Sequence, residues 1–155
     1  MSKILILLLL LAAVVTLPGC SFLANRSFGA RGISHVEAAQ LATSIASYLA
    51  GTNPAAQTTI AVEIPKFARL RDPLAPALAD GLRQAGFAVI ETDTGIPLPA
   101  RTRLLSYEVA AWSDGVSIRL QLDSSLISRW YTRAPGGVLT AAAPFSIREV
   151  SYVGQ

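Results

Sequence analysis

The first sustained pattern of apolar and polar positions along the chain is helical. Ser34 and Glu37 have the spacing of a capping box, in which a serine hydroxyl and a glutamate carboxylate each accept from the other's backbone N–H. Apolar residues then recur three or four positions apart, at Leu41, Ile45, Tyr48 and Leu49. Gly51 and Asn53-Pro54 follow as stop signals. We predict a helix that begins beside Ser34 and packs one face on a core.

A strand, a second helix and another strand are predicted next. Residues 58–64 are rich in β-branched side chains and end at Pro65, which favours a strand. Asp72 is placed as the N-cap of a helix and Pro73 as its first residue, and Gly86 is placed to end that helix. Its buried stripe is formed by Leu74, Leu78 and Leu82. Residues 87–91 predict a second strand before a loop at 95–99.

From Arg103 onward the period changes to two. Apolar residues occupy alternate positions in 105–109 and 116–122, on either side of a Ser113-Asp114-Gly115 turn, which predicts an antiparallel hairpin with one buried face. Further strands are predicted at 126–133, 138–140 and 145–153. The order of elements predicts an α+β domain, with two helices packed on one face of a mainly antiparallel sheet of five to six strands.

The residues ahead of this domain have the layout of a secretory signal. Lys3 precedes an unbroken apolar run at 4–15, which closes at Leu17-Pro18-Gly19-Cys20. A membrane-spanning helix needs about 20 apolar residues, so the shorter run argues against that alternative. Leu17, Gly19 and Cys20 resemble the lipobox of bacterial lipoproteins, although Pro18 replaces the more usual Ala or Ser.

The lipobox resemblance implies cleavage before Cys20 and attachment of a diacylglycerol and an N-acyl chain to that residue, which would hold the protein at a membrane. Cys20 is the only cysteine, so no intramolecular disulfide or thiolate metal cage is expected, and its alternatives are a buried residue of an uncleaved helix or a free thiol. Ser21 stands where an inner-membrane retention signal would place Asp, which favours the outer membrane with the domain facing the periplasm.

These features predict three parts: a lipoprotein signal peptide at 1–19, a lipid-anchored tether at 20–33 and a periplasmic α+β domain at 34–155. The tether has no sustained period but carries the apolar residues Phe22, Leu23 and Phe28. It reads as a spacer, and docking of this stretch on a partner or at the lipid interface is the open alternative.

Composition argues against nucleic acid as a ligand. The chain has 13 Lys and Arg against 10 Asp and Glu, a formal net charge of +3, and its arginines form no run. Arg101 and Arg103 are among the nearest approaches to a basic cluster, either as a solvated surface or as weak contacts to lipid phosphates.

Candidate catalytic residues are few. His35 is the only histidine, and it lies in the first turn of a predicted helix, so neither a hydrolytic triad nor a histidine metal site is expected. Glu91 and Asp93 form the only close carboxylate pair of the mature chain and are interpreted as solvated turn residues. We predict no enzyme activity, no cofactor, no metal and no small-molecule substrate.

A candidate partner-binding site lies in the strand at 126–133. Arg129, Tyr131 and Arg133 share one strand face with Ile127, and Trp130 is on the other. Tyr, Trp and Arg anchor many interfaces, so Arg129, Trp130, Tyr131 and Arg133 are predicted to bind a protein partner. The alternative is that Trp130 packs in the core and the arginines form a solvated ladder, and an edge strand could also accept a partner strand.

Several stretches carry a family resemblance that spans most of the mature chain. They are residues 39–42, 59–62, 78–89, 105–107 and 128–131, which include Leu82-Arg83-Gln84-Ala85-Gly86-Phe87-Ala88-Val89 and Ser128-Arg129-Trp130-Tyr131. In their order and pattern they resemble the TrbH-type lipoproteins of conjugative transfer systems.

The resemblance implies a structural component of a type IV secretion apparatus that transfers DNA between cells. Its partners would be other transfer proteins of the cell envelope, and it implies no reaction. The alternative is a pilotin-like or regulatory lipoprotein of another secretion or cell-wall machine, because small anchored α+β domains serve both roles.

Overall fold

The structure is a computed structural model that describes residues 29–64, 71–93 and 95–149. The predicted signal peptide, Cys20 and the tether up to residue 28 lie outside the described residues, as does the predicted strand beyond residue 149. The last five residues of the predicted tether, 29–33, are described, and two of them form the short strand β1 (Gly29–Ala30).

The first predicted helix is confirmed as α2 (His35–Thr52). The capping box is present, since the Ser34 hydroxyl accepts from the Glu37 N–H at 3.2 Å and the Glu37 carboxylate accepts from the Ser34 N–H at 2.7 Å. The helix continues through Gly51 and ends where the Asn53 N–H donates to the Leu49 carbonyl at 2.8 Å. A single turn of 3₁₀-helix, η1 (Ala55–Gln57), follows.

The second predicted helix is α3 (Leu74–Gln84). The Asp72 carboxylate caps it, accepting from the N–H groups of Leu74 at 2.9 Å and Ala75 at 3.3 Å. Pro73 already has helical backbone angles but stands one residue before the first assigned helical position. Gly86 ends the helix as predicted, with φ at 93°, a left-handed conformation that suits a residue without Cβ.

The strands form one eight-stranded sheet in the order β3-β2-β4-β5-β6-β7, with β1 on β4 and β8 on β6. Their bounds are β2 (Thr59–Glu63), β3 (Ala88–Thr92), β4 (Thr102–Ala111), β5 (Gly115–Leu122), β6 (Ser125–Ala134), β7 (Val138–Ala141) and β8 (Ser146–Glu149). β2 runs parallel to β3 and β4, β1 runs parallel to β4, and the other pairs are antiparallel. β7 and β8 pair with successive halves of β6.

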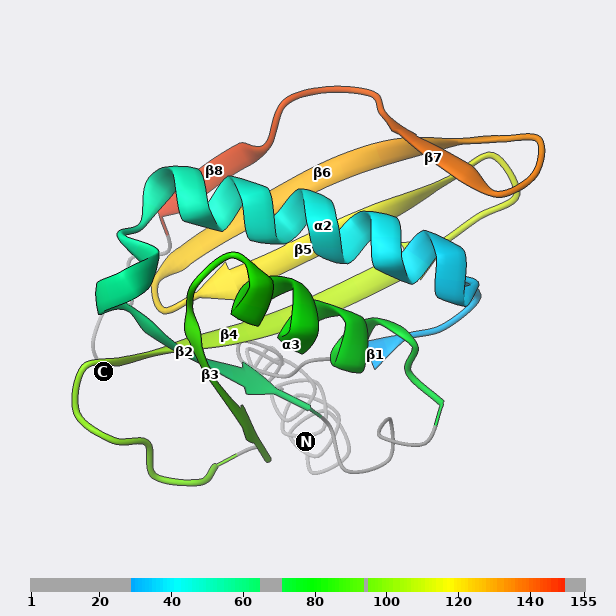
Figure 1. Cartoon of the computed structure of the whole chain (residues 1–155). Helices are drawn as coiled ribbons and strands as arrows, with labels where there is room; N and C mark the ends of the chain where they lie inside the picture. Colours follow the sequence, from blue (N-terminus) through cyan, green and yellow to red (C-terminus); the bar gives the residue numbers. More distant parts are fainter. Residues whose placement is uncertain (1–28, 65–70, 94, 150–155) are drawn as a thin grey trace, which may run out of the picture.

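Both helices cover the same face of the sheet, α2 across β5 and β6 and α3 beside it (Figure 1). This confirms the predicted class, an α+β domain with two helices on one face of a mainly antiparallel sheet. The core lies between the layers and contains the predicted stripes of both helices and the alternating apolar residues of the hairpin. Its fully buried members include Leu41, Ile45, Leu49, Leu74, Leu78, Leu82, Leu105, Tyr107, Ile118 and Leu120.

Candidate functional site

The predicted partner-binding residues of β6 divide between the two faces of the sheet. Arg129, Tyr131 and Arg133 share the face of Ile127, as predicted, and this face lies against α2. Tyr131 is only 4% exposed. Trp130 lies on the face away from the helices and is only partly buried, and both arginines have partners within the domain. The alternative of a core tryptophan with a solvated arginine ladder is therefore wrong.

Arg133 joins three parts of the chain that are distant in sequence. Its Nε donates to the Glu37 carboxylate of α2 at 2.6 Å, and its other nitrogens donate to the backbone carbonyls of Trp112 and, at 3.5 Å, of Gly32. The side chains of Arg133 and Glu37 are 22% and 5% exposed. The pair therefore fixes the first turn of α2 to the β4–β5 turn and to the segment that follows β1.

The position of Glu37 favours its charged form. Burial on its own would raise the pKa of Glu37, but hydrogen bonds from the Ser34 backbone N–H and from Arg133 lower that pKa below its ordinary value. The same carboxylate thus closes the capping box and neutralises Arg133. Sequence spacing predicted the first role, and the second depends on the tertiary fold.

Arg129 and Tyr131 fasten the middle of α2 to the sheet through Ser44. The Tyr131 hydroxyl and the Ser44 hydroxyl lie 2.8 Å apart, and the Arg129 guanidinium donates to Ser44 at 3.2 Å and to the Ala143 carbonyl at 2.7 Å. The guanidinium also lies 4.7 Å from the ring centroid of Phe145. These contacts hold the β7–β8 connection against α2, so the arginine acts inside the domain as well as at its surface.

Trp130 packs against a second tryptophan, Trp112, which was not among the residues predicted from sequence to bind a partner. The rings of Trp130 and Trp112 lie with centroids 5.2 Å apart, and Trp112 is 50% exposed. The ring of Trp130 lies over Gly115, where an added Cβ would come within 2.5 Å of it. The signal that could have identified Trp112 is its place just before the predicted 113–115 turn, which directs it to the end of the hairpin.

An open groove of about 810 Å³ runs between α2 and β7. It is lined by His35, Val36, Ala39, Gln40, Thr43, Ser44, Ser47, Val138 and Leu139. The Gln40 side-chain oxygen accepts from the Leu139 N–H at 2.7 Å, which covers part of the β7 edge. Predicted surface residue His35 is exposed at one end of this groove.

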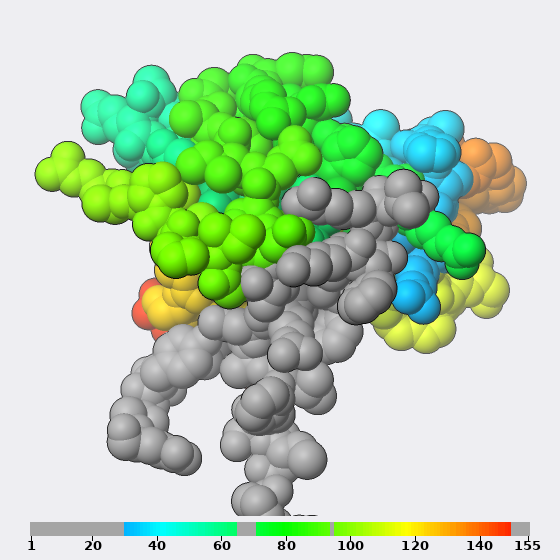
Figure 2. Space-filling view, turned by 90° about the horizontal axis from the view of Figure 1, so that it is seen from below, coloured from blue at the N-terminus to red at the C-terminus, as the bar shows by residue number. Residues whose placement is uncertain are grey.

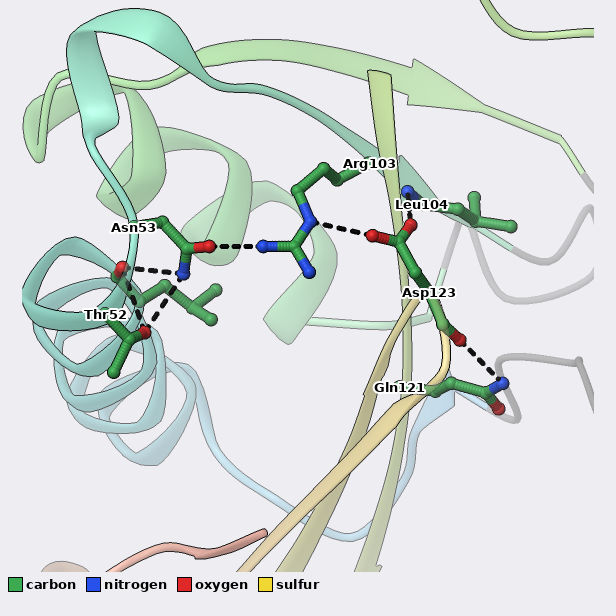
Figure 3. Close-up of polar contacts among 7 residues, drawn as sticks. Thr52, Asn53, Arg103, Leu104, Gln121 and Asp123 are labelled. Carbon is green, nitrogen blue, oxygen red and sulfur yellow. Dashed lines mark hydrogen bonds and ion pairs between the residues drawn. The ribbon is translucent and has the colours of Figure 1, made fainter. Parts of the chain in front are cut away.

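A second polar cluster joins the other end of α2 to the β5–β6 turn (Figure 3). The Arg103 side chain donates to the side-chain oxygen of Asn53, the residue that caps α2, and to the Asp123 carboxylate at 2.7 Å. Asp123 also accepts from the Leu104 N–H at 3.0 Å and has a positive φ of 53°. Arg103, one of the predicted basic pair Arg101 and Arg103, therefore stabilises the fold through these contacts.

The carboxylates of Glu91 and Asp72 are bound into local structure. Glu91 forms an ion pair with Arg83 at 3.0 Å on the surface. Asp72 is buried, and its second oxygen accepts from the Tyr107 hydroxyl at 2.6 Å and the Ala30 N–H at 3.0 Å. Within residues 29–64, 71–93 and 95–149, no group of three or more His, Cys, Asp or Glu could hold a metal ion. In the same ranges, neither helix has the length and apolar character needed to cross a bilayer.

Comparison with known proteins gives one positive result that bears on function. A family model described as conjugal transfer protein TrbH matches residues 23–149. No curated protein and no solved structure matches the chain. The match covers well over half of the chain and includes both helices and all eight strands of the described domain.

Proposed function

Since the chain belongs to the TrbH family of conjugal transfer proteins, we propose that it is an outer-membrane lipoprotein of a conjugative type IV secretion apparatus, with a structural role in assembly. The observation that carries this proposal is the family match, which supports the resemblance drawn from sequence. The chain would bind other transfer proteins of the envelope. It would catalyse no reaction and need no cofactor beyond its own acyl chains.

The anchor is proposed from the N-terminal sequence. A charged residue, an apolar run and the lipobox-like Leu17-Pro18-Gly19-Cys20 together support cleavage before Cys20 and acylation of that cysteine. Several acyl chains bury enough methylene groups, at about 0.8 kcal/mol each, to hold a protein stably in a bilayer. Ser21 supports sorting to the outer membrane, with the folded domain in the periplasm.

An assembly role is supported by a surface that the predicted interface residues hold in place. Arg129, Tyr131 and Arg133 hold α2 against β6, and the groove between α2 and β7 lies directly beside them. We propose that these residues contribute to partner binding mainly by fixing the shape of this surface.

The experiment is crosslinking in donor cells that carry the transfer genes. The lipidated chain is crosslinked, purified from membranes with detergent and analysed by mass spectrometry for Cys20 acylation and for attached proteins. Acylated Cys20 with crosslinks to other transfer proteins is the expected result. A Cys20→Ser chain is the control and should stay uncleaved or leave the outer membrane. Continued cleavage at the same position in this variant would contradict the proposed anchor.

The same experiment separates the alternative function. Crosslinks to a secretin or to a cell-wall synthase, in place of transfer proteins, would indicate a pilotin-like or regulatory lipoprotein of another machine. Acylation would be the same in both cases, so only the identity of the crosslinked proteins distinguishes them.

A further inference from the structure

Exposed apolar side chains gather at one end of the domain. Within the described residues, the large apolar side chains with high exposure are Val36, Ile96, Trp112, Val138 and Ile147. Three of them, at 61%, 50% and 51% exposure for Val36, Trp112 and Val138, lie where α2 begins and where the β4–β5 and β6–β7 turns meet (Figure 1). We call Val36, Trp112, Trp130 and Val138 the aromatic tip.

The aromatic tip is held in a fixed arrangement. Trp112 rests against Trp130, and Gly115 has no side chain that would displace the Trp130 ring. Arg133 donates to the Trp112 carbonyl and pairs with Glu37, the residue next to Val36. Half of the Trp112 side chain therefore stays exposed on a rigid support, although indole is a costly group to leave in water.

The first described residues after the proposed anchor run toward the tip, since β1 is parallel to β4 and begins beside the middle of that strand. β1 pairs with β4 at Glu108 and Val109, and a Cβ added to Gly32 would lie 3.3 Å from the Cβ of Ala111, which precedes Trp112. Figure 2 shows this blue segment next to the yellow-green β4–β5 turn. Gly29 lies opposite Glu108, so it is about 13 Å from the level of Trp112 along β4. An extended chain from residue 20 to residue 29 spans at most about 30 Å, so a bilayer that holds Cys20 is within reach of the tip.

We infer that the aromatic tip lies against the phospholipid headgroups of the membrane that holds the lipid anchor, an inference that rests on the proposed anchoring at Cys20. Tryptophan prefers this depth because its ring is apolar while its N–H can still meet water or a headgroup. The exposed Arg31 and His35 beside the tip can face lipid phosphates. Of the acidic residues at the same end, Asp114 is exposed and Glu37 is buried in its pair with Arg133. In this inference Trp130 supports the ring of Trp112 against lipid, whereas the sequence predicted that Trp130 binds a protein partner.

The other end of β4 provides an internal reference. Ile96 is 52% exposed and lies in the loop that precedes β4, whereas Trp112 follows the last residue of that strand. A strand of this length separates its two ends by about 30 Å. A domain resting on its aromatic tip therefore keeps Ile96 away from the bilayer.

Tryptophan fluorescence tests the inference directly, because Trp112 and Trp130 are the only two tryptophans of the whole chain. The full chain, purified from cell membranes, is reconstituted into vesicles of phosphatidylethanolamine and phosphatidylglycerol whose acyl chains carry bromine either near the glycerol or near the bilayer centre. Trp130→Phe leaves Trp112 as the sole reporter. A matched control combines Trp112→Phe and Trp130→Phe with Ile96→Trp and so moves the reporter to the far end.

The expected result is loss of Trp112 emission with shallow bromines, a smaller loss with deep bromines, and no loss for the reporter at position 96. Emission that acrylamide quenches from the water while neither bromolipid does so would overturn the inference. Equal quenching of the reporters at 112 and 96 would also overturn it, since the domain would then have no preferred orientation.

A protein contact is distinguished by repeating the measurement with crosslinked transfer proteins present. Shielding of Trp112 from both bromolipid and acrylamide, only in that sample, would assign the tip to a protein partner and overturn the lipid contact. The mass of the Cys20 peptide reports acylation separately. An acylated Cys20 peptide together with unquenched Trp112 would overturn the lipid contact of the tip alone, whereas an unmodified Cys20 peptide would contradict the proposed anchor.

Discussion

The ion pair between Glu37 and Arg133 should stabilise the domain far more than an ion pair on its surface. We propose a double-mutant cycle with Glu37→Gln, which keeps the size of the side chain, and Arg133→Met, which keeps an apolar stem. The 2.6 Å contact joins side chains that are 5% and 22% exposed, so water screens it weakly. A hydrogen bond between charged groups contributes about 1.5–3 kcal/mol, and we expect a coupling energy in that range.

Arg133→Met alone should lower the free energy of unfolding by about 2–3 kcal/mol. The loss stays below that for a fully unpaired buried charge because the Ser34 N–H still donates to Glu37. This loss is measured by urea unfolding followed by circular dichroism. Tryptophan fluorescence is not used, because Arg133 donates to the Trp112 carbonyl and its substitution would change Trp112 emission without unfolding the domain.

The surface pair Glu108 and Arg119 is the matched control. It also joins a glutamate to an arginine, at 3.2 Å between the neighbouring strands β4 and β5, but its side chains are 39% and 61% exposed. The same substitutions there should give a coupling energy of no more than about 0.5 kcal/mol. A coupling energy for Glu37 and Arg133 as small as that of the control would refute the argument that burial makes this pair strong.

Three other perturbations follow from the same contacts. Because the pKa of Glu37 is lowered in the folded protein, its carboxylate stabilises the domain above the ordinary carboxyl pKa of 4.5, and this stabilisation is lost as the pH falls through the folded-state pKa. Glu37→Gln should therefore make the loss of stability in acid less steep over this pH range. Tyr107→Phe should cost about 1.5–3 kcal/mol by removing the hydroxyl that donates to Asp72. Burial raises the pKa of Tyr107, so the domain should lose stability above pH 10.0, where this tyrosine begins to ionise in the unfolded chain. In Tyr107→Phe the stability should depend less on pH in this range. Gly115→Ala should lower the urea midpoint, with an overpacking cost of about 1–3 kcal/mol, since the new methyl group meets the Tyr131 carbonyl and the Trp130 ring; an unchanged midpoint would show that the aromatic tip can relax.

The parts of the fold that sequence predicted are those governed by local pattern. The capping box at Ser34 and the alternation on either side of the 113–115 turn depend on residues close in sequence, and both are confirmed. β1 could not be predicted in this way, because two residues have no period. It forms because β4 continues past the end of β2 and because the buried Asp72 accepts from the Ala30 N–H.

The candidate site was only partly accessible to the same reasoning. Alternation correctly placed Arg129, Tyr131 and Arg133 on one face of β6, but pattern alone did not indicate which face α2 would cover. From sequence alone, a strand face with two arginines is expected to be exposed to solvent, because the partners of the two guanidinium groups are not known. Glu37 is 96 positions away from Arg133 in the sequence, so that pairing emerges only from the fold.

Quantitative mating tests the central claim, a structural role in conjugative transfer, most directly. Donor cells would carry the transfer genes with this gene deleted, and complementation would use either the unchanged gene or its Cys20→Ser variant at matched protein levels. Deletion should abolish transfer, the unchanged gene should restore it, and Cys20→Ser should not. Transfer at the full rate after deletion would contradict the proposed function, and full restoration by Cys20→Ser would contradict the need for the anchor.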